Sequence, residues 1–358
     1  MFSFKKSMEE YRVVLFWLAI GLIASFISVW FCENASARFG GAIIWPSDSY
    51  KKDVRAYRNP DHYKSPEGAV KTLVEALSEN DEKKLSAIFG PDGKTLVSSG
   101  DEVADKAARE RFLQAYQEKN EIVKVSGKKA ILEIGNDAWP FPIPIVKKPE
   151  DGWFFDVRQG KEELLNRRIG RNELNAIQVC LAYVDAQREY ASKDRNGDGV
   201  LEYAPKFLSD PGTKDGLYWE AGEGEEQSPL GPLIGEAKKE GYEKKPGNEP
   251  TPYHGYYYKV LKAQGRSAPR GAYDYVIDGR MVGGFAMVAY PAQYGSSGIK
   301  TFIVSQDGVV YEKNLGAKTA SIAQDMQTFD PDRSWRKVQG KYLEISGENN
   351  GDQKSLQQ

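Results

Sequence analysis

The sequence predicts an α+β fold built from two consecutive domains, in which helices pack on antiparallel sheets. Helical periodicity over residues 65–117 is followed by strand-like segments over 122–157. A second helical segment, 161–192, is again followed by strand-like segments, over 253–313. Such a separation of helices from strands is typical of α+β folds. The 358-residue chain is also longer than one compact core usually holds.

The first domain, residues 65–160, is expected to begin with three helices. Ser65 is a hydroxyl cap in front of Pro66, which stands where a helix loses no hydrogen bond. One apolar face follows at helical spacing, made of Val70, Leu73, Val74 and Leu77. Asp81 is expected to cap a second helix, and a third is expected over 103–117. Four strands should follow at 122–125, 130–134, 141–146 and 153–157.

The second domain, residues 161–338, is expected to open with the long helix 161–192. Its apolar stripe contains Ile177, Cys180, Leu181 and Val184. Residues 207–252 are rich in Gly, Pro and charge, and they predict long surface loops. Strands are expected at 253–261, 273–277, 284–290 and 300–313, the last with a two-residue hairpin turn at Asp307 and Gly308.

Residues 194–202 (DRNGDGVLE) carry the most specific chemical motif of the chain. Oxygen-bearing residues at alternate positions and a glycine that allows a sharp turn match the first half of a calcium-binding loop. Pro205 stands where an EF-hand has its bidentate glutamate, which excludes a true EF-hand. The candidate calcium ligands are Asp194, Asn196, Asp198, Val200 and Glu202. The alternative is an Asx/Gly turn that ends the helix.

Histidine limits the enzyme classes that the chain can support. His62 and His254 are the only histidines, so a Ser-His-Asp or Cys-His site must use one of them. His254 is the better candidate, because strand alternation would place it on one face with Tyr256 and Tyr258. The candidate catalytic residues are His254, Asp278 and Arg280, and the alternative is a structural histidine. No phosphate-binding GxxxxGK[ST] motif is present, and no organic cofactor is expected.

The first 37 residues predict export. Residues 13–32 are uncharged and long enough to span a bilayer, and the small residues Ala35 and Ala37 suit a signal peptidase. Cleavage would give a periplasmic or secreted protein, whereas an uncut segment would anchor the chain in the inner membrane, facing outward. Residues 38–64 are expected to be a linker, and 339–358 a disordered tail.

Composition argues against a nucleic-acid partner. Lys and Arg total 49 against 51 Asp and Glu, a formal charge of -2, whereas nucleic-acid binding needs a clustered positive field. Membrane contact is expected only through the N-terminal segment. Beyond that segment Cys180 is the only cysteine, so no disulfide is expected.

Three resemblances follow from these patterns. Helices followed by a four-stranded meander resemble the cystatin-like and NTF2-like layout. A long helix, an Asp-rich loop and a sheet resemble the globular half of type IV pilins and pseudopilins. Residues 166–173 (NRRIGRNE), 252–257 (PYHGYY) and 294–298 (YGSSG), with the hairpin at Asp307, resemble a bacterial exported family known as domain of unknown function 2950, over most of 60–338. That resemblance implies export and an architecture, and no reaction.

The function predicted from the sequence is that of a non-catalytic envelope protein. It would act as a binding or assembly module, stabilised by calcium, for an envelope protein or glycan. The alternative prediction is a periplasmic hydrolase with its site around His254.

Overall fold

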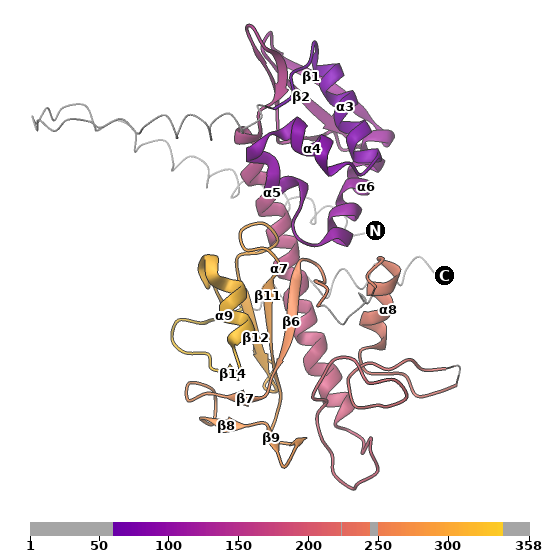
Figure 1. The fold of residues 1–358 in the computed structure, drawn as a ribbon, viewed down its shortest axis with the longest axis vertical. Coiled ribbons are helices and arrows are strands. Elements are labelled where there is room, and N and C mark those ends of the chain that lie inside the picture. Colours follow the sequence, from indigo (N-terminus) through magenta and orange to yellow (C-terminus); the bar gives the residue numbers. More distant parts are fainter. Residues whose placement is uncertain (1–59, 223, 244–249, 339–358) are drawn as a thin grey trace, which may run out of the picture. The chain divides into compact units, whose positions relative to one another are not determined.

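The computed structural model describes residues 60–222, 224–243 and 250–338, which belong to one compact unit. The predicted export segment, most of the predicted linker and the predicted tail lie outside these residues. Within the described ranges, no helix is both long enough and apolar enough to cross a membrane. The fold is α+β, with helices packed on antiparallel sheets (Figure 1).

The N-terminal helices begin where the sequence predicts caps. Ser65 Oγ accepts a hydrogen bond from the Gly68 amide at 3.1 Å, and Asp81 accepts from two amides of the next helix. The third helix begins one residue earlier than predicted, with Asp101 as its cap. The helices are α3 (Pro66–Ser78), α4 (Glu82–Phe89), α5 (Lys94–Val97) and α6 (Glu102–Glu118), with a 3-10 turn η2 (Pro91–Gly93) between α4 and α5.

The first sheet is antiparallel in the order β1-β2-β4-β5, and β3 also pairs with β2. Its strands are β1 (Asn120–Ser126), β2 (Lys129–Ile134), β3 (Trp139–Pro140), β4 (Ile145–Lys148) and β5 (Gly152–Phe155). The predicted strand 141–146 is wrong over its first four residues. Pro142 and Pro144 have no amide hydrogen for a ladder, and pairing with β5 starts only at Ile145. Helices α3 and α4 pack on this sheet and enclose the first core, whose buried apolar residues run from Ala69 to Val157.

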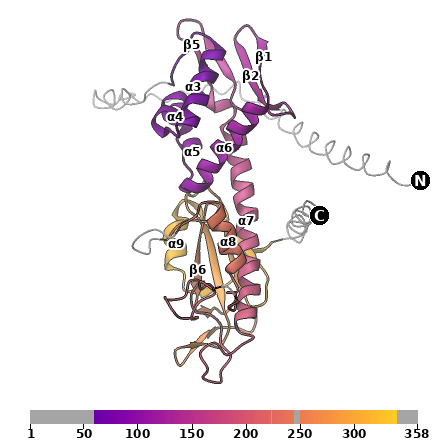
Figure 2. The same cartoon turned by 90° about the vertical axis from the view of Figure 1, so that its right-hand side faces the viewer.

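Helix α7 (Lys161–Tyr190) follows the 3-10 turn η3 (Val157–Gln159) and contributes to both hydrophobic cores. Leu164 packs against the first core, and residues from Ala176 to Tyr190 belong to the second core. Cys180 is fully buried there. Figure 2 shows α7 running from the N-terminal helices to the sheet of the second core. The structure also has helices α8 (Gly231–Lys239) and α9 (Thr319–Asp325), the latter after the 3-10 turn η5 (Gly316–Lys318). Helix α8 corrects the prediction that 207–252 is loop throughout.

The sheet of the second core has the order β15-β13-β12-β11-β6 and is antiparallel. Its strands are β6 (Tyr256–Leu261), β11 (Ala286–Pro291), β12 (Thr301–Ser305), β13 (Tyr311–Lys313) and β15 (Arg336–Lys337). Strands β11 and β12 are buried along their whole length, so both faces of the sheet centre are covered. Smaller sheets are formed by β7 (Ala263–Gln264), β8 (Tyr273–Asp274) and β14 (Thr328–Phe329), and by β9 (Val276–Ile277) and β10 (Arg280–Met281).

Two predictions in this half are wrong in detail. Residues 253–255 are not strand, because His254 has φ +49 and Gly255 has φ +77, which form a turn before β6. The alternation that placed His254 on one face with Tyr256 therefore does not apply. The hairpin after β12 is longer than two residues, since Ile303 pairs with Tyr311 and residues 306–310 form the loop.

Candidate functional site

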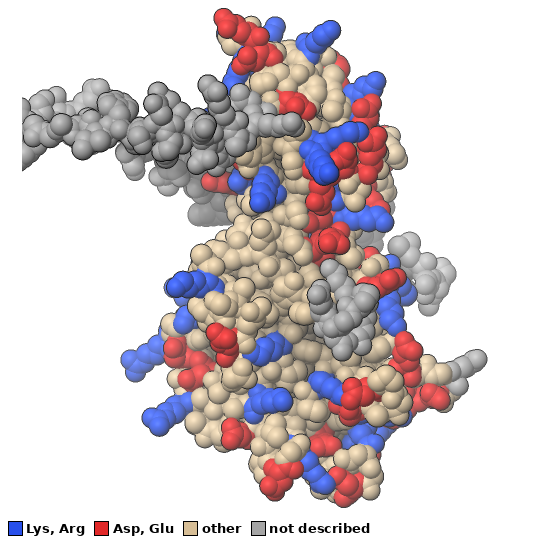
Figure 3. All heavy atoms as spheres, in the orientation of Figure 1, with Lys and Arg blue, Asp and Glu red and all other residues tan. Residues whose placement is uncertain are grey.

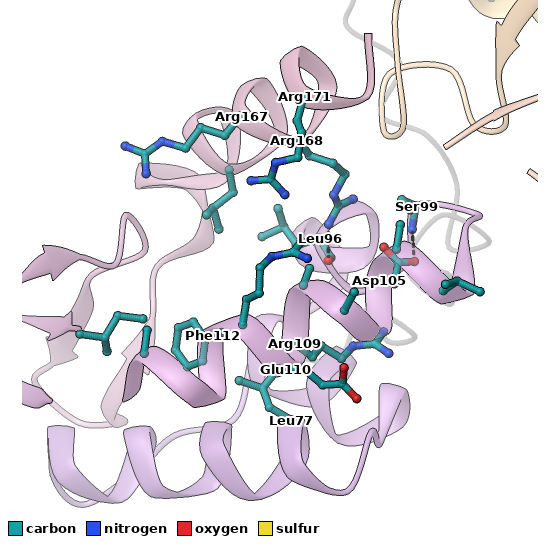
Figure 4. A pocket seen from close by; sticks show the side chains of 18 of the residues that line it. Leu77, Leu96, Ser99, Asp105, Arg109, Glu110, Phe112, Arg167, Arg168 and Arg171 are labelled. Atoms are coloured by element: carbon teal, nitrogen blue, oxygen red, sulfur yellow. Dashed lines mark hydrogen bonds between the residues drawn. The ribbon is translucent and has the colours of Figure 1, made fainter. Parts of the chain in front are cut away.

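A cavity of about 1030 Å³ is lined largely by α6 and α7. On α7 the lining residues recur every three or four positions and share one face, whereas on α6 they extend around most of the helix. They are Val103, Ala104, Asp105, Ala107, Ala108, Arg109, Glu110, Arg111, Phe112, Ala115 and Glu118 on α6, and Leu164, Arg167, Arg168, Arg171, Asn172 and Asn175 on α7. Four of the α6 residues are alanines, whose small side chains leave space next to the helix. Figure 4 shows Arg168 and Arg171 extending from α7 toward the side of the cavity that α6 forms.

Part of the cavity wall is apolar and belongs to the first core. Phe112 packs edge-on against Phe141 with ring centroids 5.5 Å apart, and Trp139 packs edge-on against the same ring at 6.3 Å. The apolar lining residues are Leu73, Leu77, Phe89, Leu96, Val97, Phe112, Ile134, Trp139, Phe141 and Leu164. Apolar side chains of the first core therefore form part of the cavity wall, where they can contact a ligand.

Two of the arginines that line the cavity are hydrogen-bonded to other groups of the protein. Arg168 donates to the carbonyls of Thr95 at 2.7 Å and Leu96 at 2.8 Å, and to Ser296 Oγ at 3.3 Å. Arg109 is buried and donates to the Val97 carbonyl at 2.7 Å and to Glu82 at 3.1 Å. Both side chains are engaged in fixing the backbone around α5.

Asp105 supplies negative charge next to these arginines. Its carboxylate accepts from the Ser99 amide at 2.8 Å, a contact drawn in Figure 4. Burial raises the pKa of Asp105, while that hydrogen bond and the charges of Arg168 and Arg109 lower it in part. This carboxylate therefore serves the packing of α6 against the preceding loop.

The remaining three arginines face the cavity differently. Arg167 pairs with Glu163 at 2.7 Å and lies over the Trp139 ring at 5.2 Å from its centroid. Among the residues that the structure describes, Arg111 and Arg171 form no ion pair within 4.0 Å and no side-chain hydrogen bond. Both residues line the cavity. Partial burial lowers the pKa of Arg171, and the charge of Arg111 lowers it further.

His254 lines the same cavity, next to the second core. Its Nε2 lies 3.3 Å from Glu240 Oε2, and its ring packs at a tilt of 53° against Tyr253, with 4.1 Å between centroids. Burial lowers the pKa of His254, the charge of Asp101 raises it in part, and Arg111 lowers it. Burial also raises the pKa of Glu240. Within the described ranges, Glu240 is the only polar side chain paired with the imidazole, and no hydroxyl or thiol is hydrogen-bonded to it.

Asp101 forms hydrogen bonds to segments of both cores, close to His254. It is almost fully buried, caps α6 through the Ala104 amide at 3.0 Å, and accepts from Tyr242 Oη at 3.0 Å. It also accepts from the Gly255 amide at 2.7 Å, 154 positions away in sequence. One carboxylate thus fixes the start of α6 and the turn before β6 at the same point.

Further hydrogen bonds surround this contact. Asn172 Nδ2 donates to the Ser297 carbonyl at 2.9 Å, and Glu173 accepts from the amides of Ile299 at 3.1 Å and Lys300 at 3.0 Å. We call the contacts among residues 95–105, 168–173, 242–243, 250–255 and 293–300 the junction. The junction includes most of the segments 166–173 and 252–257 and all of 294–298, on which the family resemblance is based.

The predicted catalytic residues are not grouped around His254. Asp278 lies in the turn between β9 and β10, and Arg280 pairs with Asp198 at 2.7 Å. Neither residue lines the cavity or contacts His254 through a hydrogen bond or ion pair. Figure 1 shows β9 at the end of the fold opposite to α6.

The predicted calcium ligands are largely joined to one another and to the backbone. Asn196 Nδ2 donates to Asp198 and to Glu202, each at 3.0 Å, and the Val200 amide donates to Asp198 at 3.0 Å. The amides of Gly199 and Gly197 donate to Asp194 and lower its pKa. In the part of the chain that the structure describes, no three His, Cys, Asp or Glu side chains are grouped as metal ligands. Calcium binding stays a prediction.

A functional role for Arg111 or Arg171, and the cavity itself, were not predicted from the sequence. A usable signal was present in the run of alanines at helical spacing in α6. Another was the pattern of Arg167, Arg168 and Arg171, which places three cations on one face of α7. Neither pattern shows that the two helix faces meet, which depends on the junction.

Comparison with known proteins identifies one family. The model of a family described as "Protein of unknown function (DUF2950)" matches residues 61–338. No curated protein and no solved structure matches the chain. The match covers both cores, the junction and the cavity.

Proposed function

The chain belongs to the DUF2950 family, whose description assigns no activity, and we propose from the cavity that it is a non-catalytic binding module for a small molecule. The observation that carries this proposal is the cavity of about 1030 Å³ lined largely by α6 and α7. Its apolar wall can hold the body of a ligand, and its many polar and charged groups can fix the orientation of that ligand.

The groups around the cavity favour binding over bond cleavage. A nucleophilic mechanism needs a base hydrogen-bonded to a hydroxyl or thiol. The imidazole of His254 is instead paired with Glu240. Cys180, the one described cysteine, is fully buried, and burial raises the pKa of its thiol, which disfavours the reactive thiolate.

Filling the cavity tests the binding function. Ala108 lines the cavity on α6, so Ala108→Trp in the full-length chain should displace a neutral apolar dye such as Nile red. Ala320→Trp, at an exposed position of α9, is the matched control and should leave dye binding unchanged. Equal dye binding by both variants, with unchanged circular dichroism, would contradict the proposal.

We propose that the protein works outside the cytoplasm, on the basis of the apolar segment 13–32 and the small residues that follow it. A fusion of alkaline phosphatase after residue 338 should be active in a bacterial host, because that enzyme needs an oxidising compartment. Replacing three apolar residues of 13–32 by Asp should abolish that activity. A fusion that is inactive with the native segment would contradict export.

The pilin-like order of α7, the Asp-rich loop and the β15-β13-β12-β11-β6 sheet supports a further proposal. Residues 161–338 would present an assembly surface for an envelope protein or glycan, stiffened by calcium at residues 194–202. Millimolar calcium should raise the melting temperature of the full-length chain, and Glu202→Gln should remove this increase, with magnesium as control ion. An unchanged melting temperature in calcium would reject the metal.

The hydrolase alternative is favoured by one observation, the position of the His254 and Glu240 pair inside the cavity. A panel of ester, peptide and glycan substrates should show turnover that His254→Gln removes if this alternative holds. Turnover unaffected by that substitution would place any activity elsewhere.

A further inference from the structure

We propose that the cavity ligand is an amphipathic anion, with its charged head between Arg111 and Arg171 and its apolar body along Leu77, Phe112 and Trp139. This inference rests on the proposed binding function and names the chemical class of its ligand.

The two arginines form a cationic pair without a counterion in the described part of the chain. Arg111 extends from α6 and Arg171 from α7, and both line the cavity. The other cavity arginines have partners: Arg109 with Glu82, Arg167 with Glu163, and Arg168 with backbone carbonyls. Two guanidinium groups that face one space repel each other, and an anion bound between them relieves that repulsion. Guanidinium groups also match carboxylate and phosphate oxygens in bidentate geometry.

Acidic residues of the cavity do not neutralise this pair. Glu110 is paired with Lys106, and Asp105 accepts from the Ser99 amide. The charge of Arg111 lowers the pKa of Glu240, but one carboxylate balances at most one of the two guanidinium groups. The remaining two, Glu118 and Asp137, belong to the C-terminal end of α6 and the segment after β2. Among the described residues, positive charge therefore remains in excess at Arg111 and Arg171.

The surroundings of the pair define the rest of the ligand. Ala108 and Ala115, three positions before and four after Arg111 on α6, line the cavity with it, so apolar surface lies on the same side of the helix as Arg111. Phe112 of the same helix packs against Phe141 in the apolar wall. The volume of about 1030 Å³ is at the upper end of small-molecule pockets, which suits a lipid-sized body. Glu240, at the His254 side, disfavours a second negative group, so a single anionic head fits best.

Affinity measurements on the full-length chain by titration calorimetry test this inference. Decanoate and decanol share an apolar chain and differ in charge. Decanoate should bind at least about tenfold more tightly, since a charge-assisted hydrogen bond contributes about 1.5–3 kcal/mol. Arg111→Gln and Arg171→Gln should each weaken decanoate binding about tenfold or more and leave decanol binding unchanged. Arg266→Gln, at an exposed arginine outside the cavity, is the matched control and should change neither.

Two further probes separate the sources of the anionic head. Decyl phosphate binding more tightly than decanoate, with the same loss in both arginine variants, would support a phosphate-bearing lipid as the source of the anion. Inorganic phosphate or acetate binding as tightly as decanoate would overturn the amphipathic part of the inference. Raised salt should weaken decanoate binding, because ions screen exposed guanidinium groups.

These measurements can contradict the anionic ligand without contradicting the proposed binding function. Equal affinity for decanol and decanoate, without an effect of the arginine substitutions, would overturn the anion and leave the cavity as a binding site. If neither compound binds, the inference is overturned, while dye binding that Ala108→Trp removes would still support the binding function.

Discussion

At the scale of single residues, Asp101 has the largest structural role that the sequence did not indicate. A helix cap needs one acceptor, and Asp101 provides it for α6. The same carboxylate also accepts from Tyr242 and from the Gly255 amide. Both donors are buried, so each would lose a hydrogen bond without replacement by water if the acceptor were removed.

Asp101→Asn should lower the free energy of unfolding by about 2 kcal/mol, because an amide cannot accept from all three donors. Urea denaturation of the full-length chain measures this change. Asp81→Asn is the matched control, since Asp81 caps α4 through the amides of Lys83 and Lys84 only, and Asn caps equally well. Equal effects of the two substitutions would show that the contacts of Asp101 beyond α6 add no stability.

His254 should make the protein less stable as the pH falls. Burial and Arg111 lower the pKa of its imidazole from 6.5 despite the charge of Asp101, so the unfolded chain binds the proton more tightly than the folded chain. Stability is then full above pH 6.5 and decreases as the pH falls from 6.5 through the lower folded pKa.

Urea denaturation of the native chain and of His254→Gln at several pH values measures this contribution, and His62→Gln is the control. Glu240, whose pKa is raised, acts in the opposite sense at lower pH and is common to the native chain and the variants. A constant difference between the native chain and His254→Gln from pH 7.5 to 5.5 would contradict the prediction.

At the scale of elements, propensity and periodicity predicted most helices and strands, and the failures have local causes. Pro142 and Pro144 shorten the strand that their apolar neighbours indicate. The segment before β6 has a strand-like composition, yet hydrogen bonds to Asp101 and Tyr242 hold residues 254 and 255 at positive φ. Helix α8 lies in a region whose Gly and charge content suggested loops.

Gly255→Ala should destabilise the protein by more than the conformational cost alone, which is about 1–2 kcal/mol at positive φ. A Cβ atom at Gly255 would lie 2.4 Å from Asn172 Nδ2 and 3.1 Å from Ser297 Cβ, inside the junction. Gly212→Ala is the matched control, because Gly212 has φ +79 and open space around it. Equal losses in thermal melting would show that the junction yields to the added methyl group.

At the scale of the whole described chain, the junction joins two hydrophobic cores that share α7. On the face seen in Figure 3, acidic and basic side chains are interspersed over the described residues. The contacts of the junction are hydrogen bonds between buried or partly buried groups. Arg168 donates three of them. The cavity lies next to these contacts, so its shape depends on their integrity.

Arg168→Gln should expose the first core more often than the second. The substitution leaves the carbonyls of Thr95 and Leu96 without their donor and removes a positive charge that lowers the pKa of Asp105, a loss of about 2–3 kcal/mol. Hydrogen exchange of β2 and β11 measures opening of the two cores separately. Arg167→Gln, which removes an exposed pair with Glu163, is the control and should change exchange little. Equal acceleration in β2 and β11 would mean that the cores open together.

The sequence by itself determined the α+β class, the capped helix starts at Ser65 and Asp81, the long helix α7 and the family, because these depend on local periodicity, local hydrogen bonds and short motifs. Only the tertiary structure decided where the cavity lies and which residues line it. Arg111 and Arg171 are 60 positions apart by residue number, and Asp101 and Gly255 are 154 apart. No pattern along the chain specifies that such residues meet, since their approach depends on how two separately formed cores are joined.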